Sequence, residues 1–282
     1  MKVSSGSARK PLGAAASLRL HWQEYTMEAG ELGIYMFFAC AFATLLQHPG
    51  SPIRRLLPYE MLRRTIMGLA LGTTAVGIVL SPWGKQSGGH FNPAITVAFY
   101  RLGKVDSWDV VFYLTGHFLG AVAGVTLAAL VLLGAPADHA VRYAITMPGK
   151  YSQMTAFIAE AAISFVLMLM ILFVSNRDDL ARYTPYLAGA LIATYITFES
   201  PLSGMSTNPA RTFGSALFAG YWYGLWIYFI APPLGMLAAA ELFLRVRGGI
   251  GPYCAKLAHV DDKRCIFRHG TADLRYRTDI RR

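Results

Sequence analysis

Two asparagine side chains in matching surroundings are the residues of this chain best suited to bind a small polar molecule. Asn-Pro-Ala occurs at 92–94 and again at 208–210, and the frame Ser-Gly-x3-Asn-Pro-Ala-x-Thr surrounds both copies. Asn is a favoured helix N-cap and Pro fits the first helical turn, so each copy should begin a helix. The Asn oxygen then caps its own helix, and the amide NH2 remains as a fixed donor. The matched frame indicates an internal duplication.

The helices that follow these asparagines are too short to cross a membrane. The uncharged stretch from Asn92 to Tyr100 predicts a helix of about 14 Å, and the hydrocarbon core is about 30 Å thick. Two such helices entering from opposite faces and meeting at Asn92 and Asn208 would make one split span with a positive centre. Non-helical backbone at this depth requires protein or a water-filled cavity around it. Residues 85–91 and 199–207 should therefore line a cavity, and Arg211 belongs in it.

Composition places the rest of the chain in a membrane. Of its 282 residues, 54% are hydrophobic and only 15% are charged, whereas soluble proteins carry about a quarter charged residues. The sequence predicts an all-α membrane protein with six transmembrane helices plus two half-helices in two inverted repeats, because three spans in each half force the second half to enter from the opposite face. The predicted spans are 29–47, 65–84, 109–134, 154–175, 183–199 and 222–244.

These spans divide the chain into five segments. They are a basic N-terminal leader (1–24), a first repeat (25–134, with half-helix 92–101), a connecting loop (135–153), a second repeat (154–246, with half-helix 208–219) and a basic tail (247–282). The leader lacks the apolar core of a signal peptide.

Charge predicts the orientation. Most of the 26 Lys and Arg residues lie in the leader, the 85–104 and 176–182 loops and the tail. The positive-inside rule then puts both termini in the cytoplasm of a multi-pass protein of the plasma (inner) membrane. The net charge of +10 comes largely from the tail, which suits a solvated, topogenic segment near anionic lipid better than a nucleic-acid binder.

Over about residues 25–246 the sequence resembles the major intrinsic protein family, the aquaporins and glycerol facilitators. The resemblance is carried by Ser87-Gly88-Gly89-His90-Phe91-Asn92-Pro93-Ala94, Asn208-Pro209-Ala210-Arg211, Glu160 and Ala231-Pro232-Pro233-x-Gly235. It implies a homotetrameric channel with one pore per subunit and no energy coupling. Water at the pore centre would accept from Asn92 and Asn208, while the half-helix ends and Arg211 would repel protons and cations.

The family's narrow filter, counted onto this chain by its spacing, consists of Gly72, Ile196, Met205 and Arg211. Water-selective members place Phe and His at the first two positions, so the resemblance implies a wider, more apolar filter, which flexible Met205 could fill. Glycerol facilitators place Asp after the filter Arg, where this chain has Thr212. We therefore expect a channel for water and other small neutral solutes, with a glycerol-type facilitator as the alternative.

Other polar residues near the repeats suit structural roles. By resemblance, Glu160 holds the backbone of the second pore loop, and its first-repeat counterpart is either Glu28 or Glu31. His90 is expected to pack beside the first half-helix as pore-loop support. His117 suits a hydrogen-bonded helix contact better than a pH sensor.

The tail carries four soft ligands within sixteen residues: Cys254, His259, Cys265 and His269. Their spacing matches no standard zinc motif, so an ordinary tail with incidental thiols and no cofactor is favoured. The alternative is a tetrahedral zinc site. A disulfide is not expected in a cytoplasmic tail.

Two other classes of membrane protein share features of this sequence. Secondary transporters also have inverted repeats and broken helices, but they need coupling-ion groups, and no carboxylate is assigned to the lumen. A non-conducting structural protein would not need Asn92, Asn208 and Arg211 together. No nucleophile and base pair suggests an enzyme.

Overall fold

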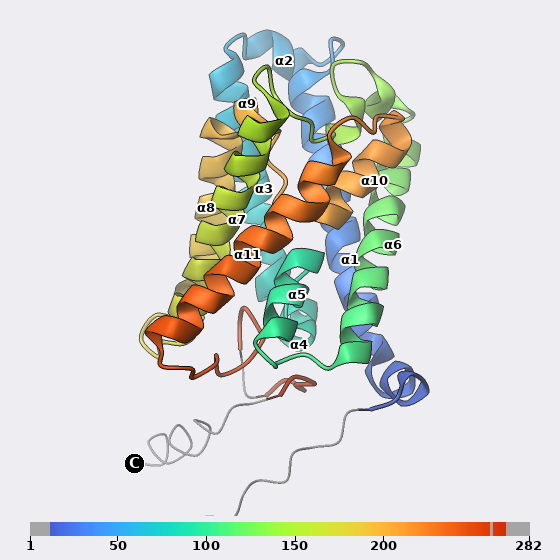
Figure 1. Ribbon diagram of the computed structural model, residues 1–282. Coiled ribbons are helices and arrows are strands. Elements are labelled where there is room, and N and C mark those ends of the chain that lie inside the picture. The colour runs from blue at the N-terminus through green and yellow to red at the C-terminus, as the bar shows by residue number, and fades with distance from the viewer. Residues whose placement is uncertain (1–11, 260–261, 269–282) are drawn as a thin grey trace, which may run out of the picture.

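The computed structural model describes residues 12–259 and 262–268, which form helices and loops without strands (Figure 1). Six long helices surround two short ones. The long helices are α1 (Ala14–Gln47), α3 (Glu60–Leu80), α6 (Ser107–Val131), α7 (Gln153–Ser175), α8 (Thr184–Phe198) and α11 (Leu225–Val246).

The two half-helices lie inside this bundle, one after each Asn-Pro-Ala. They are α5 (Pro93–Arg101) and α10 (Pro209–Ala219). In Figure 1, α5 lies in the lower half of the bundle and α10 in the upper half. Short helices α2 (Pro52–Leu56), α4 (Pro82–Ser87) and α9 (Ser200–Ser203) and the 3-10 turns η1 (Ala135–Ala137), η2 (Arg142–Ala144) and η3 (Ala181–Tyr183) complete the loops.

The predicted all-α membrane fold with two repeats is confirmed. Five of the long helices are long and apolar enough to cross a membrane, and α8, at 15 residues, is the shorter sixth. The packing repeats as the sequence does. In the first repeat α1 packs on α6, in the second α7 packs on α11, and α3 packs on its counterpart α8.

Small residues make these helix contacts close. A Cβ added at Gly120 of α6 would lie 2.0 Å from the carbonyl oxygen of Ala29, and one at Gly235 of α11 would lie 2.2 Å from that of Ala161. Glycine at both positions therefore lets helix backbones touch, which is how helices associate where lipid removes the hydrophobic driving force.

Several helix boundaries differ from the predicted ones, and two of the differences have a clear cause. The first long helix begins at Ala14, so residues 14–24 of the predicted leader are helical. Here His21 and Tyr25 bond the buried carboxylate of Asp109 at 2.9 and 2.6 Å. The second span ends at Leu80 instead of residue 84. Ser81 caps a new helix by accepting from the Gly84 N–H at 3.1 Å, and Pro82 begins it because it has no N–H to continue α3.

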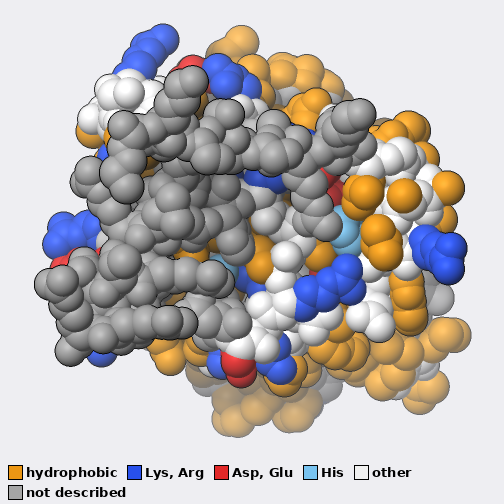
Figure 2. Space-filling model, turned by 90° about the horizontal axis from the view of Figure 1, so that it is seen from below, with side chains coloured by type: hydrophobic (Ala, Val, Ile, Leu, Met, Phe, Trp, Pro, Cys, Tyr) orange, Lys and Arg blue, Asp and Glu red, His pale blue; other side chains and the backbone are white. Residues whose placement is uncertain are grey.

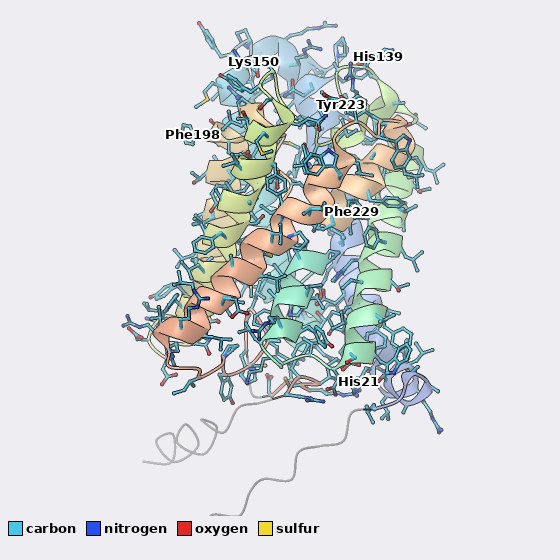
Figure 3. All side chains as sticks on the ribbon, viewed as in Figure 1. His21, His139, Lys150, Phe198, Tyr223 and Phe229 are labelled. Atoms are coloured by element: carbon cyan, nitrogen blue, oxygen red, sulfur yellow. The ribbon has the colours of Figure 1, made fainter. Side chains whose placement is uncertain are left out.

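The bundle has two distinct ends. We call the end that carries α4, the 102–106 loop and residues 251–259 and 262–268 the tail face, and the other end, with α2 and residues 135–152, the loop face. In Figure 3, His21 lies toward the tail face, and His139 and Lys150 lie at the loop face. Between them large apolar side chains such as Phe198 and Phe229 are exposed, as expected for a surface that faces lipid.

Candidate pore

The two asparagines cap the half-helices that they precede. Asn92 Oδ1 accepts from the Ala94 N–H at 2.9 Å, and Asn208 Oδ1 accepts from the N–H groups of Ala210 and Arg211, both at 3.1 Å. Both asparagines have extended backbone and are followed by proline, the combination that starts a helix without leaving a buried donor unpaired. Each side chain is thereby fixed at the positive end of its helix.

The remaining amide groups tie the two repeats together. Asn92 Nδ2 donates to the carbonyl oxygen of Thr207 and Asn208 Nδ2 donates to that of Phe91, each at 2.8 Å. Each NH2 group carries two hydrogens, and these bonds use one of them. The second hydrogen of each amide is left for the cavity that both side chains line. The donor pair is thus rigid, and its geometry depends on both pore loops.

Buried glutamates hold the pore loops from behind. Glu160 accepts from Ser203 Oγ and the Ser206 N–H, both at 2.7 Å, and from the Thr207 N–H at 2.8 Å. Its carboxylate therefore pairs donors that a loop at membrane depth could not otherwise satisfy.

The first repeat uses Glu28 in the same way. Glu28 accepts from the His90 N–H at 3.0 Å and the Phe91 N–H at 2.6 Å, the positions that correspond to Ser206 and Thr207. Ser87 Oγ donates at 2.7 Å to Glu31 instead. The counterpart of Glu160 is therefore Glu28, and Glu31 takes over one of its bonds. His117 Nε2 lies 2.8 Å from Glu28, so it forms the expected helix contact.

The backbone of the two loops follows the same unusual path. The first loop has positive φ at Gly88, Gly89 and Phe91, and the second at the matching residues Gly204, Met205 and Thr207. Such residues cost energy unless their surroundings fix them. Met205 stands where the first loop has glycine, and its φ of 53° places its side chain in the cavity lining.

A narrow cavity of about 40 Å³ runs past the two asparagines. A single water needs roughly 10–15 Å³ of such space, so the cavity suits a short file of waters. Most of its lining is apolar. Its lining includes Tyr35, His90, Asn92, Met205, Asn208, Arg211 and Leu257. None of the residues described as lining it carries a carboxylate.

Arg211 supplies the only charged side chain of this lining among the described residues. Its side chain is buried, and its Nη1 has no hydrogen-bond partner within the described part of the chain. A buried unpaired donor is costly. A passing solute with an acceptor oxygen would satisfy it, and a cation would be repelled.

The predicted filter residues separate into two groups. Met205 and Arg211 line the cavity, whereas Gly72 and Ile196 are not among its lining residues. Ile196 is buried in α8, one turn beyond the lining residue Ile192. A Cβ added at Gly72 would lie 2.4 Å from the carbonyl oxygen of Gly189. Gly72 therefore serves the contact between α3 and α8, and the prediction that it widens the lumen loses its physical basis.

Several lining residues were not anticipated from the sequence, and Tyr35 and Leu257 are two of them. Tyr35 reaches the cavity from α1, and its ring packs 5.8 Å from that of Phe91. Leu257 reaches it from the tail, far along the chain from either pore loop. Neither belongs to a motif, and a tyrosine or leucine in an apolar stretch carries no signal of its own. His90, which was predicted to support the loop, contacts both Thr96 and the tail residue Ala255.

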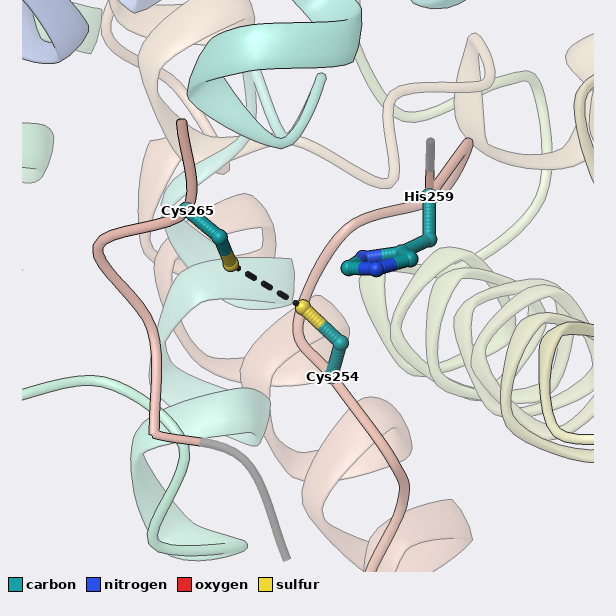
Figure 4. Close-up of side chains that lie close together, drawn as sticks. All are labelled: Cys254, His259 and Cys265. Carbon is teal, nitrogen blue, oxygen red and sulfur yellow. Dashed lines mark hydrogen bonds between the residues drawn. The ribbon is translucent and has the colours of Figure 1, made fainter. Parts of the chain in front are cut away.

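The tail brings three of its four candidate ligands together. Ligand atoms of Cys254, His259 and Cys265 all lie within 4.8 Å of one another (Figure 4). The two Sγ atoms are 3.4 Å apart. His269 lies outside the described residues.

The fold and the paired asparagines define a class: multi-pass membrane proteins whose two inverted repeats meet in a pore. Residues 16–243 match the family model of the major intrinsic proteins. The chain therefore belongs to the major intrinsic protein family, whose members are channels for water or small solutes.

Individual relatives are distant. Aquaporin-4 of Rattus norvegicus is 30% identical over 79% of this chain, which spans only 66% of that protein. Aquaporin NIP3-1 of Arabidopsis thaliana is 31% identical over 83% of the chain and 74% of its own length. Glycerol uptake facilitator protein-like 6 of Lactiplantibacillus plantarum is 33% identical over 62% of the chain and 81% of its own length. The solved aquaglyceroporin of Plasmodium falciparum shares the fold, with a TM-score of 0.66 at 19% identity over 80% of this chain and 97% of its own.

Proposed function

We propose that this protein is a passive channel for water, and for other small neutral solutes, that excludes protons and ions. The observation that carries the proposal is the pair of reciprocal bonds from Asn92 to the Thr207 carbonyl oxygen and from Asn208 to that of Phe91, which leaves one N–H of each amide for the cavity. A water that accepts from both must turn its own hydrogens away along the pore. This breaks a proton-conducting chain, and the positive half-helix ends and Arg211 oppose cations.

The lining argues against ion-coupled transport. Its described residues include asparagine amides and an arginine but no carboxylate that would bind a driving ion. Three bonds fix each pore loop to buried glutamates, and one more bond ties each loop to the other repeat, so the two pore loops do not form a moving gate.

A glycerol-type facilitator is the second candidate, because one of the relatives is a glycerol uptake facilitator. Thr212, at the position where such channels usually carry Asp, is buried and bonds Thr146 and Ser206 at 2.6 and 2.5 Å. Its hydroxyl is thus engaged in the loop. Together with the narrow cavity, this favours water.

We place the tail face in the cytoplasm of a homotetramer in the plasma membrane. The placement rests on the excess of Lys and Arg in the segments of that face. Figure 2, which views the molecule from this side, shows several Lys and Arg side chains on it and hydrophobic side chains at its rim. The tetramer is proposed from the family alone.

Stopped-flow light scattering on proteoliposomes tests the solute preference. Purified protein is compared with protein-free liposomes for water, glycerol and protons. Water flux well above the control without a proton leak supports the proposal. Glycerol flux above control with little water flux would overturn the proposal in favour of a glycerol-type facilitator. Flux that depends on an imposed proton or sodium gradient would overturn both channel functions in favour of a secondary transporter.

A further inference from the structure

The chain beyond α11 turns back and crosses the tail face of its own bundle. In Figure 1 it lies beneath α4 and α5. It bonds four separate elements of that face. The bonds run from Tyr253 N to Asn176 Oδ1 (2.6 Å), from Leu257 N to Gly88 O (3.0 Å), from Arg264 Nη2 to Leu20 O (2.6 Å) and from Arg268 N to Lys104 O (2.9 Å).

The middle of this segment enters the pore mouth. The Leu257 side chain is only 3% exposed and lines the cavity that contains the two asparagines. Beside it, Ala255 O lies 2.7 Å from His90 Nε2, and the ring of Phe267 stacks on His90 with centroids 5.5 Å apart. An apolar side chain at this point offers water no hydrogen bond and narrows the exit. The tail therefore forms part of the cavity lining at the tail face.

A charged side chain is buried under the same segment. Lys256 is 2% exposed, and its Nζ donates to the carbonyl oxygens of Lys85 at 2.8 Å and Arg264 at 2.7 Å. These bonds link the two segments of the tail to each other and to α4. Burying a lysine ammonium is costly unless it is hydrogen-bonded, and these two bonds to backbone carbonyl oxygens reduce that cost.

The three soft ligands flank the closing residue. Cys254 and His259 lie on either side of Leu257 in the chain, and Cys265 comes from the second tail segment, residues 262–268. In a tetrahedral zinc site with Zn–S bonds of about 2.3 Å, ligand atoms are about 3.8 Å apart. The observed 3.4 Å between the sulfurs, and the 4.8 Å limit for all three atoms, need only small shifts to match. A water would complete the coordination.

We propose that Cys254, His259 and Cys265 bind a Zn²⁺ ion that holds Leu257 in the pore mouth and closes the channel. Thiolate and imidazole ligands select zinc over hard cations such as Mg²⁺ and Ca²⁺. Binding releases the two thiol protons, so the site carries two thiolates against the 2+ charge of the ion. The closing role rests on the proposed channel function, whereas the metal site does not.

Zinc content tests the site itself. Purified protein, incubated with Zn²⁺ and desalted, is measured by elemental analysis beside Cys254→Ser/Cys265→Ser and the control Cys40→Ser. Cys40 is a buried thiol of α1 whose Sγ lies 3.5 Å from the Tyr143 carbonyl oxygen, away from the tail. We expect one zinc per chain in the wild type and in the control, and none in the double variant. Equal zinc in all three would overturn the site. An intact mass lower by two hydrogens, with no zinc bound, would show a disulfide between Cys254 and Cys265 and would also overturn the zinc site.

Stopped-flow water permeability tests the closing role on the same samples in liposomes. Added Zn²⁺ should lower wild-type permeability several-fold, and a chelator should restore it. The water permeability of the double variant should change neither with Zn²⁺ nor with the chelator. Leu257→Ala keeps the three ligands, so it should still bind zinc but lose most of the inhibition. Zinc bound with unchanged permeability would refute the closing role. If no variant conducts water with or without zinc, the channel function fails while the zinc content still decides the metal site.

Discussion

Replacement of Glu160 by glutamine perturbs the second pore loop with almost no change of shape. The carboxylate accepts three hydrogen bonds, from Ser203 Oγ and from the backbone N–H groups of Ser206 and Thr207. Glutamine turns one acceptor oxygen into an NH2 donor. Whichever way the amide is oriented, at least one buried donor of the loop then faces another donor.

The cost follows from these three bonds. A buried donor without a partner costs about 1–3 kcal/mol, and the other bonds lose the negative charge that strengthens each by about 1 kcal/mol. Together the destabilisation is about 3–5 kcal/mol. At about 2–4 °C per kcal/mol, the melting temperature should fall by about 6–20 °C. Because the same loop carries Asn208, water permeability should fall as well.

Thermal melting of the purified protein in detergent, followed by stopped-flow measurement well below the melting temperature, provides the assay. Ser164→Ala is the matched control, since Ser164 lies one turn farther along α7 and its buried Oγ has no hydrogen-bond partner in the described chain. That variant should melt as the wild type does. If Glu160→Gln and Ser164→Ala behave alike in both measurements, the account of the carboxylate as the anchor of the loop is refuted.

Two further substitutions test the pore centre and the predicted filter. Asn208→Asp sets a carboxylate oxygen against the carbonyl oxygen of Phe91 in place of a 2.8 Å hydrogen bond. Water permeability should therefore drop several-fold, and the free energy of unfolding should fall by about 1–3 kcal/mol. Unchanged water flux in stopped-flow assays would contradict the bond between the repeats. Gly72→Ala forces a Cβ to 2.4 Å from a backbone oxygen and should cost about 1–3 kcal/mol, whereas Gly77→Ala in the same helix meets nothing within 4 Å and should be neutral or stabilising by about 0.4–1 kcal/mol. Equal melting temperatures for the two glycine variants would contradict the packing role of Gly72 and support its predicted place in the filter.

The two repeats solve the same problem with different side chains. Both loops need two backbone N–H groups satisfied at membrane depth, and a glutamate does this in each. In the first repeat, however, Glu28 also contacts His117, and Ser87 Oγ donates to Glu31 instead of to Glu28. This division explains why spacing alone did not identify the counterpart of Glu160, since two carboxylates one turn apart both reach the loop.

The sequence by itself determined the architecture and the pore centre of this protein. Hydrophobic stretches near the length of a bilayer specify membrane helices, and Asn-Pro-Ala specifies a capped helix start wherever it occurs. These are local constraints, so six spans, two half-helices and the pairing of Asn92 with Asn208 could all be predicted. The half-helices, with 9 and 11 residues, are too short to span the membrane alone, as their sequences predict.

Only the tertiary structure decided which residues face the lumen and what covers its mouth. Family spacing placed Gly72 in the filter, but the side on which α3 meets α8 is a matter of helix rotation and crossing, and it points Gly72 at Gly189. The entry of Leu257 into the cavity depends on bonds between the tail and distant loops. Such contacts join residues far apart in the chain, and no local pattern encodes them.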